Sequence, residues 1–179
     1  MKANTSTNVR FLVQAAMIAA LYTALTLVAI MLNWAFGPVQ FRFSEAMTIL
    51  PAFTSAAIPG LTIGCFLSNL WSSMGAMDMI FGTLATLLAA IATRAVRHIR
   101  VKGIPVLAPL PPVLFNALIV GLEITIVSPE GFLWPAFLAN ALSVGLGELA
   151  ACYVLGLPLA ILLDRHDAEN RLFSLRSTR

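Results

Sequence analysis

Residues Phe11–Leu32 read FLVQAAMIAALYTALTLVAIML, a run of 22 residues without a charged side chain. The hydrocarbon core of a bilayer is about 30 Å thick, and about 20 residues of α-helix cross it. The run is too long for the apolar centre of a cleaved signal peptide, which has roughly 7–15 residues. We therefore expect a transmembrane helix over about residues 11–33.

The composition of the whole chain extends this reading to all 179 residues. Of these residues, 59% are apolar and 11% are charged, and the mean hydropathy is +0.90. Soluble domains have roughly 25% charged residues, which cover their surface. We therefore expect an all-α integral membrane protein that forms one transmembrane domain over residues 1–179, with no room for a soluble catalytic module.

Apolar segments of membrane-crossing character recur along the chain. Pro59 and Gly60 divide an uncharged interval of 32 residues, Ala46–Met77, into two pieces that are each short for a bilayer. We expect a compact bundle of six transmembrane helices, the second and third short, with the five later helices at about 43–57, 60–74, 78–100, 106–127 and 133–164. A re-entrant hairpin in place of the two short helices is the alternative, and the charge pattern does not choose between them.

The basic residues fall into three clusters beside the apolar segments. Ten of the eleven are Lys2 and Arg10; Arg94, Arg97, Arg100 and Lys102; and Arg165, Arg171, Arg176 and Arg179. Basic residues next to membrane spans favour the cytoplasmic side, so both termini and the loop around residues 94–102 are expected in the cytoplasm. A nucleic-acid partner is not expected, because these residues flank spans and do not form one face.

Acidic residues dominate the remaining, apolar part of the chain. Glu45, Asp78, Glu123 and Glu148 stand there against Arg42 alone. A charge at the centre of a bilayer costs about 2.5–3.5 kcal/mol on insertion scales, so a charged residue at that depth indicates a functional site. An acid-rich, partly desolvated pocket favours a ligand that is cationic or rich in N–H donors.

Structural explanations stay open for some of these charges. Asp78 directly precedes an expected helix and can serve as its N-cap, and Arg42 can neutralise Glu45, three residues later. Glu123 follows Asn116 by seven residues, which places both on one helix face two turns apart. That face is polar, and we expect it to point into the bundle.

Amides and one tryptophan complete the predicted substrate site. Asn69, Asn116 and Asn140 add groups that both donate and accept hydrogen bonds. Trp71, two residues from Asn69, can stack on a flat ligand. The predicted site thus takes in Arg42, Glu45, Asn69, Trp71, Asp78, Asn116, Glu123, Asn140 and Glu148.

No catalytic or cofactor motif stands out in the sequence. Lys102 is followed by Gly, so the chain has no phosphate-binding loop with a Lys-Ser or Lys-Thr pair. Cys65 and Cys152 lie far apart in apolar stretches and are interpreted as buried thiols, with no metal spacing. We expect neither enzymatic activity nor a cofactor or metal, so uphill transport needs energy from a partner or an ion gradient.

Small residues repeat at four-residue spacing on the first expected helix. The pairs are Ala15 with Ala19, Ala16 with Ala20, and Ala20 with Ala24. In lipid, such pairs let two helices approach closely. The surface is therefore a candidate for docking, either of another helix of this chain or of a partner.

Five ordered motifs resemble the QueT family, which comprises substrate-binding (S) components of energy-coupling factor (ECF) transporters. They are FGPVQFRFSEA at 36–46, AIPG at 57–60, DMIFGTLAT at 78–86, LAPLPP leading into FNA at 107–117, and LSVGLGE running to LP at 142–158. The resemblance spans roughly residues 22–163. The first residues, the turn at 128–135 and the tail after residue 163 do not contribute to it.

The resemblance implies a subunit of a larger ATP-driven importer in a bacterial inner membrane. It implies six helices, cytoplasmic termini, a ligand site near the extracellular side, and three partner chains: a transmembrane coupling subunit and two ATPases. The alanine strip then becomes the docking face for the coupling subunit. The implied cargo is a queuosine precursor, a 7-deazaguanine whose N–H edge and aminomethyl arm suit carboxylates.

Other functions stay open on the sequence alone. One is an S component for a different flat molecule that is cationic or rich in donors. Another is a proton-coupled secondary transporter that uses Glu123 and Glu148 as its relay. An intramembrane enzyme ranks third, because the sequence offers no nucleophile.

Overall fold

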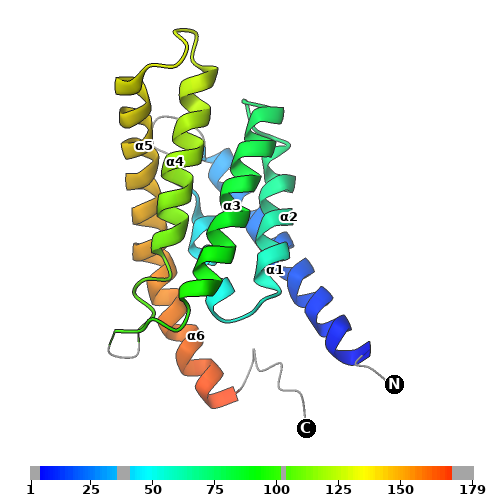
Figure 1. The fold of residues 1–179 in the computed structure, drawn as a ribbon. Helices are drawn as coiled ribbons and strands as arrows, with labels where there is room; N and C mark the ends of the chain where they lie inside the picture. Colours follow the sequence, from blue (N-terminus) through cyan, green and yellow to red (C-terminus); the bar gives the residue numbers. More distant parts are fainter. Residues whose placement is uncertain (1–4, 36–40, 102–103, 171–179) are drawn as a thin grey trace.

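The computed structural model describes residues 5–35, 41–101 and 104–170, and within these ranges its regular elements are all helices (Figure 1). The predicted all-α class is confirmed. One element, η1, is a 3-10 helix, and another, η2, is a π-helix. In chain order the elements are α1 (Thr5–Met31), η1 (Phe43–Ala52), α2 (Ala57–Asn69), α3 (Ala76–Val96), α4 (Leu110–Val127), α5 (Trp134–Leu149), η2 (Ala150–Gly156) and α6 (Leu157–Asn170).

Four helical stretches in the described part of the chain are long and apolar enough to cross a membrane. They are Thr7–Met31, Ala76–Val96, Leu110–Val127 and Trp134–Arg165. The last stretch joins α5, η2 and α6 into one continuous helical rod. Large apolar side chains such as Met31, Leu142 and Val154 are exposed on the outside of these stretches, while charged side chains are buried between them. This distribution is that of a helical membrane protein.

The two short segments, η1 and α2, lie within the bundle as an antiparallel pair. A 3-10 helix rises about 2.0 Å per residue, so η1 covers about 20 Å, and α2 covers a similar length at about 1.5 Å per residue. Pro51 lies inside η1 and has no N–H for an α-helical ladder. Arg94 Nη1 donates to the Pro51 carbonyl at 3.1 Å. The turn after η1 therefore lies near the C-terminal end of α3.

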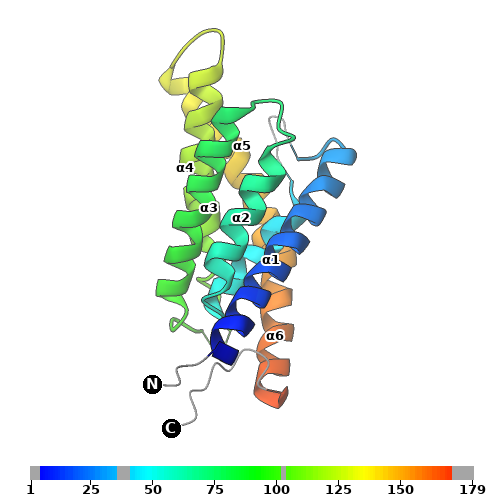
Figure 2. The same cartoon turned by 90° about the vertical axis from the view of Figure 1, so that its right-hand side faces the viewer.

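The long helices follow one another around the bundle in chain order. α1 packs on α2, α2 on α3, α3 on α4 and α4 on α5, while η1 lies inside and contacts α1, α3 and η2. Figure 2 shows α1 lying obliquely across α2. Gly60 and Gly64 make this crossing close: a Cβ atom on either would lie 2.8 or 2.9 Å from the carbonyl oxygens of Ala15 and Ala19.

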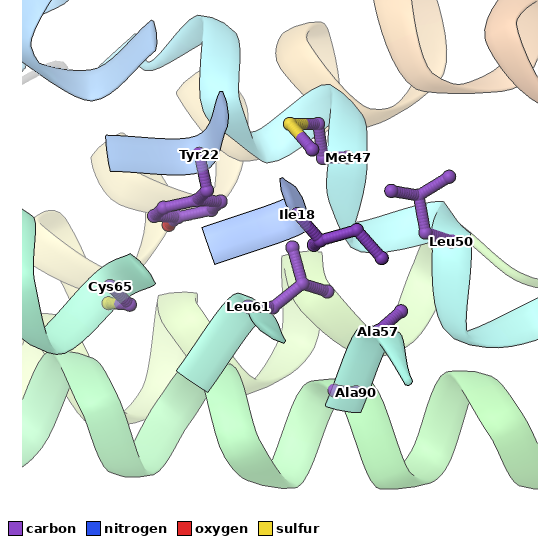
Figure 3. Close-up of a cluster of buried hydrophobic side chains, with 8 residues drawn as sticks. All are labelled: Ile18, Tyr22, Met47, Leu50, Ala57, Leu61, Cys65 and Ala90. Carbon is purple, nitrogen blue, oxygen red and sulfur yellow. The ribbon is translucent and has the colours of Figure 1, made fainter. Parts of the chain in front are cut away.

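The apolar core is centred where α1, η1, α2 and α3 meet. Figure 3 shows Ile18 and Tyr22 of α1 facing side chains from the other three elements. Tyr22 and Leu61 have no exposed surface. This core holds η1, and therefore the polar residues at its start, at a fixed depth. Its members are Ile18, Tyr22, Met47, Leu50, Ala57, Leu61, Cys65 and Ala90.

The two ends of the bundle differ in chemistry. α1 begins, and α3 and α6 end, at the same end, which brings the described members of the three basic clusters together (Figures 1 and 2). The opposite end carries two groups of aromatic rings in edge or tilted contact, typical of a membrane interface: Trp34, Phe41 and Phe43, and Phe132, Trp134 and Phe137. Lys2, Lys102 and the arginines at 171–179 lie outside the described residues.

Candidate substrate-binding site

Seven of the nine predicted site residues are buried in the bundle. They come from five elements and from the segment before η1, although they are spread over more than 100 residues of sequence. Burying so many polar groups in a membrane domain is costly unless they serve one another or a ligand. The seven are Arg42, Glu45, Asn69, Asp78, Asn116, Glu123 and Glu148.

Arg42 is the buried cation of this cluster. Its guanidinium Nη2 lies 3.9 Å from Asp78 Oδ2, and its Nε donates to the carbonyl of Ala35 at 3.1 Å. The sequence had suggested Glu45 as a partner of Arg42; the ion pair with Asp78 adds a partner from α3. Arg42 also interacts electrostatically with the other three buried carboxylates, those of Glu45, Glu123 and Glu148.

Asp78 is not the N-cap that its sequence position suggested. α3 begins at Ala76, so Asp78 lies inside the first helical turn. The N-cap residue of α3 is Gly75, which makes no side-chain capping bond. A carboxylate at this position still benefits from the positive end of the helix dipole. Asp78 instead forms an ion pair with Arg42 across the bundle.

Asn69 and Gly82 form the surroundings of Asp78. The amide Nδ2 of Asn69 donates to the main-chain carbonyl of Asp78 at 2.9 Å, while its Oδ1 has no partner among the described residues. A Cβ atom on Gly82 would lie 2.8 Å from Asn69 Nδ2 and 3.0 Å from Asp78 Oδ1. Gly82 therefore leaves room for both polar side chains.

Glu45 lies in the first turn of η1 and meets α1. Its Oε1 accepts a hydrogen bond from the Tyr22 hydroxyl, while Oε2 is buried without a partner in the described part of the chain. Thr26, one turn beyond Tyr22, donates to the Ser44 hydroxyl at 2.8 Å. α1 is thus attached to the start of η1 by polar contacts on one face.

Glu148 lies where the long C-terminal rod changes from α- to π-helix. Its Oε2 is 3.6 Å from the Cys152 thiol, and it also accepts a hydrogen bond from the Asn116 side chain of α4. The same thiol is 3.6 Å from Thr48 Oγ1 and 3.7 Å from the carbonyl of Glu45. Short π-helical segments inside α-helices are frequent at functional sites. Here the segment brings Glu148 and Glu45 together around Cys152.

Glu123 differs from the other carboxylates because neither oxygen has a hydrogen-bond partner within the described residues. Its side chain has 0% exposed surface. Asn116, on the same helix face, is buried as well, so the polar face of α4 points inward as predicted. A buried carboxylate whose oxygens are both free is costly to fold and has open acceptors for a donor-bearing ligand.

Two predicted site residues lie apart from the buried cluster. Trp71 is 58% exposed just after α2, so its stacking on a flat ligand stays a prediction. Asn140 is partly buried and donates to Thr125 Oγ1 at 3.0 Å, which joins α5 to α4. Hydropathy did not reveal where these two side chains lie, because their surroundings depend on how the helices pack.

The alanine strip of α1 is divided between two surfaces. Ala15 and Ala19 are buried against the α2 glycines, whereas Ala16, Ala20 and Ala24 are exposed. Ala16 and Ala20 help to line an apolar groove of about 450 Å³ between α1 and α2. Ala15 and Ala19 line the same groove at its base, so the strip serves both internal packing and the groove. The groove is completed by Phe11, Leu12, Pro59, Ile63 and Leu67.

Sequence reasoning missed the residues that support the cluster, above all Tyr22 and Cys152. A signal for Tyr22 was present: a phenol in the middle of an apolar span needs a hydrogen-bond partner, and Thr26 follows it at helical spacing. Cys152 follows Glu148 at the same spacing. The prediction of buried thiols for Cys152 and Cys65 is confirmed, and neither forms a disulfide.

The arrangement offers hydrogen-bonding groups to a ligand. Its polar atoms are carboxylates, amides and hydroxyls, and none of the described residues forms a group of three His, Cys, Asp or Glu side chains that could hold a metal ion. Open acceptors and a single buried cation are the features of a site that receives hydrogen-bond donors.

Comparison with known proteins agrees with the motifs quoted above. A profile of the family described as QueT transporter matches residues 12–165. The chain belongs to the QueT transporter family. All seven buried residues of the predicted site of this QueT-family chain lie within the matched region.

A curated relative carries a more specific name. It is the "Queuosine precursor transporter QueT" of Lactococcus lactis subsp. cremoris (strain MG1363), which is 40% identical over 76 residues. The alignment spans 42% of this chain and 44% of that relative, less than half of either. No solved structure matches the chain.

Proposed function

We propose that this chain is the substrate-binding subunit of an ATP-driven importer and that it takes up a queuosine precursor, a 7-deazaguanine. The observation that carries the proposal is Glu123, which is fully buried and whose two carboxylate oxygens have no hydrogen-bond partner among the described residues. Family membership and the printed name of the Lactococcus relative support the choice of cargo.

The ring edge of a deazaguanine supplies hydrogen-bond donors, which Glu123 does not find in the described part of the chain. Its ring N–H and exocyclic amino group are adjacent donors, and one carboxylate can accept both in a bidentate contact. The Asn69 Oδ1, also buried without a partner among the described residues, offers a further acceptor. Such matching is worth more inside a bundle than in water, because unpaired buried acceptors cost free energy.

The ligand is proposed to enter from the extracellular side. Asp78 lies in the first turn of α3, and α3 begins at the end of the bundle opposite to the one where α1 begins and α6 ends (Figure 1). Basic residues favour the cytoplasmic side of a bacterial inner membrane. This orientation places both termini in the cytoplasm and the polar cluster nearer the outside.

The coupling partner is proposed to dock on the exposed half of the alanine strip. Ala16 and Ala20 line an apolar groove on the surface of α1 and α2, where small side chains permit close approach by a helix of another subunit. The sequence carries no ATPase motif, so two ATPase subunits and a transmembrane coupling subunit would supply the energy.

Two measurements test this function. Mass spectrometry of the chain purified in mild detergent is expected to find a co-purifying deazaguanine, which should be depleted in the Glu123→Gln variant and retained in Glu130→Gln. Uptake in cells is expected to require co-expressed ATPase and coupling subunits. Uptake without these partners that collapses with a protonophore would instead indicate a proton-coupled transporter.

A further inference from the structure

The charges inside the bundle do not balance when no ligand is present. Among the described residues the buried charged side chains are one arginine and four carboxylates, and the guanidinium of Arg42 lies against Asp78. The sequence at 36–40, FGPVQ, adds no basic residue next to this group. An ionised group that is buried without a partner is so costly that it takes up a proton instead. The imbalance therefore indicates that protons are bound inside the empty bundle.

Glu45 and Glu148 are the two carboxylates where the negative charges oppose each other most directly. They interact electrostatically, and the Cys152 thiol lies 3.7 Å from the Glu45 carbonyl oxygen and 3.6 Å from Glu148 Oε2. Oε2 of Glu45 is buried and has no hydrogen-bond partner among the described residues. The groups that donate to the two carboxylates are neutral: the Tyr22 hydroxyl, the Asn116 amide and the Cys152 thiol. Hydrogen bonds therefore reach this pair without bringing a positive charge.

The surroundings of the pair offer little compensation. Arg42 interacts electrostatically with both carboxylates but is shared with a third one. Arg94 meets η1 at the Pro51 carbonyl, near the far end of that element, and Asp164 of α6 pairs with Arg100. The titratable and charged groups around the pair are Tyr22 of α1, Cys65 of α2, Asp78 of α3, Glu123 of α4, Cys152 of η2, and Arg42.

We propose that Glu45 and Glu148 share one bound proton when the chain holds no ligand. The proposal concerns the empty chain, so it does not depend on the proposed function. Two carboxylates that interact in a dry site lose their protons in two separate steps, and the last proton belongs to the pair and not to one residue. Losing that proton would leave two like charges on either side of Cys152. The pair therefore makes the empty bundle sensitive to pH.

Infrared spectroscopy detects such a proton directly. The full chain is freed of small molecules and held in a detergent without carbonyl groups. The C=O stretch of a protonated carboxyl group is distinct from the bands of a carboxylate and shifts in D2O. Wild type should show this band at neutral pH, and the double variant Glu45→Gln/Glu148→Gln should lose the part that belongs to the pair. Glu123→Gln, the same change at a buried carboxylate outside the pair, should retain it.

Three spectroscopic results would overturn the proposal. They are a wild type without the band, a band of unchanged size in the double variant, and a band that disappears in Glu123→Gln alone. Where the double variant does not fold, the single Glu148→Gln variant takes its place. Its band should vanish at a lower pH than that of wild type, because the like-charged partner of Glu45 is gone. A band that vanishes at the same pH in both would count against a shared proton.

The pH dependence of unfolding in mixed micelles measures the same proton by linkage. Glutamates of the unfolded chain lose their protons around pH 4.3, so above this pH the folded chain holds one proton more than the unfolded chain. Stability must then fall as the pH rises, by about tenfold in the folding equilibrium constant per pH unit, until the folded pair loses its proton too. Glu130→Gln should follow wild type, and the double variant should lack this fall. A wild type and double variant with the same pH dependence would overturn the proposal.

Discussion

The hydroxyl of Tyr22 on α1 donates a hydrogen bond to the carboxylate of Glu45 on η1. Both residues are buried, and Glu45 has no other side-chain partner for its second oxygen among the described residues. The contact links the helix that carries the alanine strip to the element that carries one of the site carboxylates. A movement of α1 against η1 would therefore disturb the hydrogen bond to Glu45.

The Tyr22→Phe variant tests this link. Removing the hydroxyl leaves both Glu45 oxygens unpaired, which should cost about 1–3 kcal/mol in the free energy of unfolding and also weaken ligand binding. Tyr153→Phe is the matched control, because Tyr153 donates to the Val106 carbonyl at 3.1 Å, outside the cluster. Unfolding in mixed micelles and calorimetry measure the two effects. Equal losses of ligand affinity in the two variants would contradict a special role for Tyr22.

Glu123→Gln tests the central acceptor. The substitution keeps size and shape but replaces a charged double acceptor by a group with one acceptor oxygen, so the affinity for a deazaguanine should fall about 10- to 150-fold. Asn116→Ala should cost less, about 0.5–1.5 kcal/mol of binding free energy. Glu130→Gln, in the exposed turn before α5, serves as the control. Small and equal losses in all three would make Glu123 a structural carboxylate.

Gly60→Ala tests the close crossing of α1 and α2. The new methyl group would lie 2.8 Å from the Ala15 carbonyl oxygen and 2.9 Å from Ile18 Cβ, so the helices must separate. Overpacking of this kind typically costs about 1–3 kcal/mol of stability. Gly145→Ala on α5 is the control, since its methyl would meet only the Ala117 side chain at 3.3 Å. Equal unfolding midpoints for the two variants would mean that the crossing is loose.

Ala20→Trp tests docking on the exposed half of the strip. Ala20 lines the surface groove, so a bulky side chain should abolish uptake by blocking close helix approach while leaving ligand affinity intact. Leu142→Trp adds the same side chain at an exposed position of α5 and should leave uptake unchanged. Binding and uptake that fall together in Ala20→Trp would identify the groove as part of the chain's own packing.

Cysteine labelling tests the orientation in the membrane. A cysteine in place of Glu130 should react with an impermeant maleimide added outside intact cells, and one in place of His98 should not; both positions are exposed, at opposite ends of the bundle. Cys65 and Cys152 are buried and should contribute little background. A permeant maleimide should label both variants. The reversed pattern would place the polar cluster nearer the cytoplasm.

The class of the protein and its buried charged residues could be predicted from the sequence. Apolar segments long enough to cross a bilayer form helices, because lipid offers no hydrogen-bond partners and a helix satisfies the backbone N–H and C=O groups internally. A charged residue within such a segment must point inward, so Glu123 and Glu148 were found without knowing their neighbours. The basic clusters, being beside the span ends, were likewise predicted to share one side.

Tertiary structure alone decided which groups meet. Arg42 forms an ion pair with Asp78, 36 residues away, because the segment before η1 faces the first turn of α3. Tyr22 became a partner of Glu45 through the contact between α1 and η1, and Ala15 and Ala19 are buried because the α2 glycines pack against them. Periodicity specifies the face of a helix on which a side chain lies. The element that covers this face follows from how the helices pack, which depends on contacts distant in sequence.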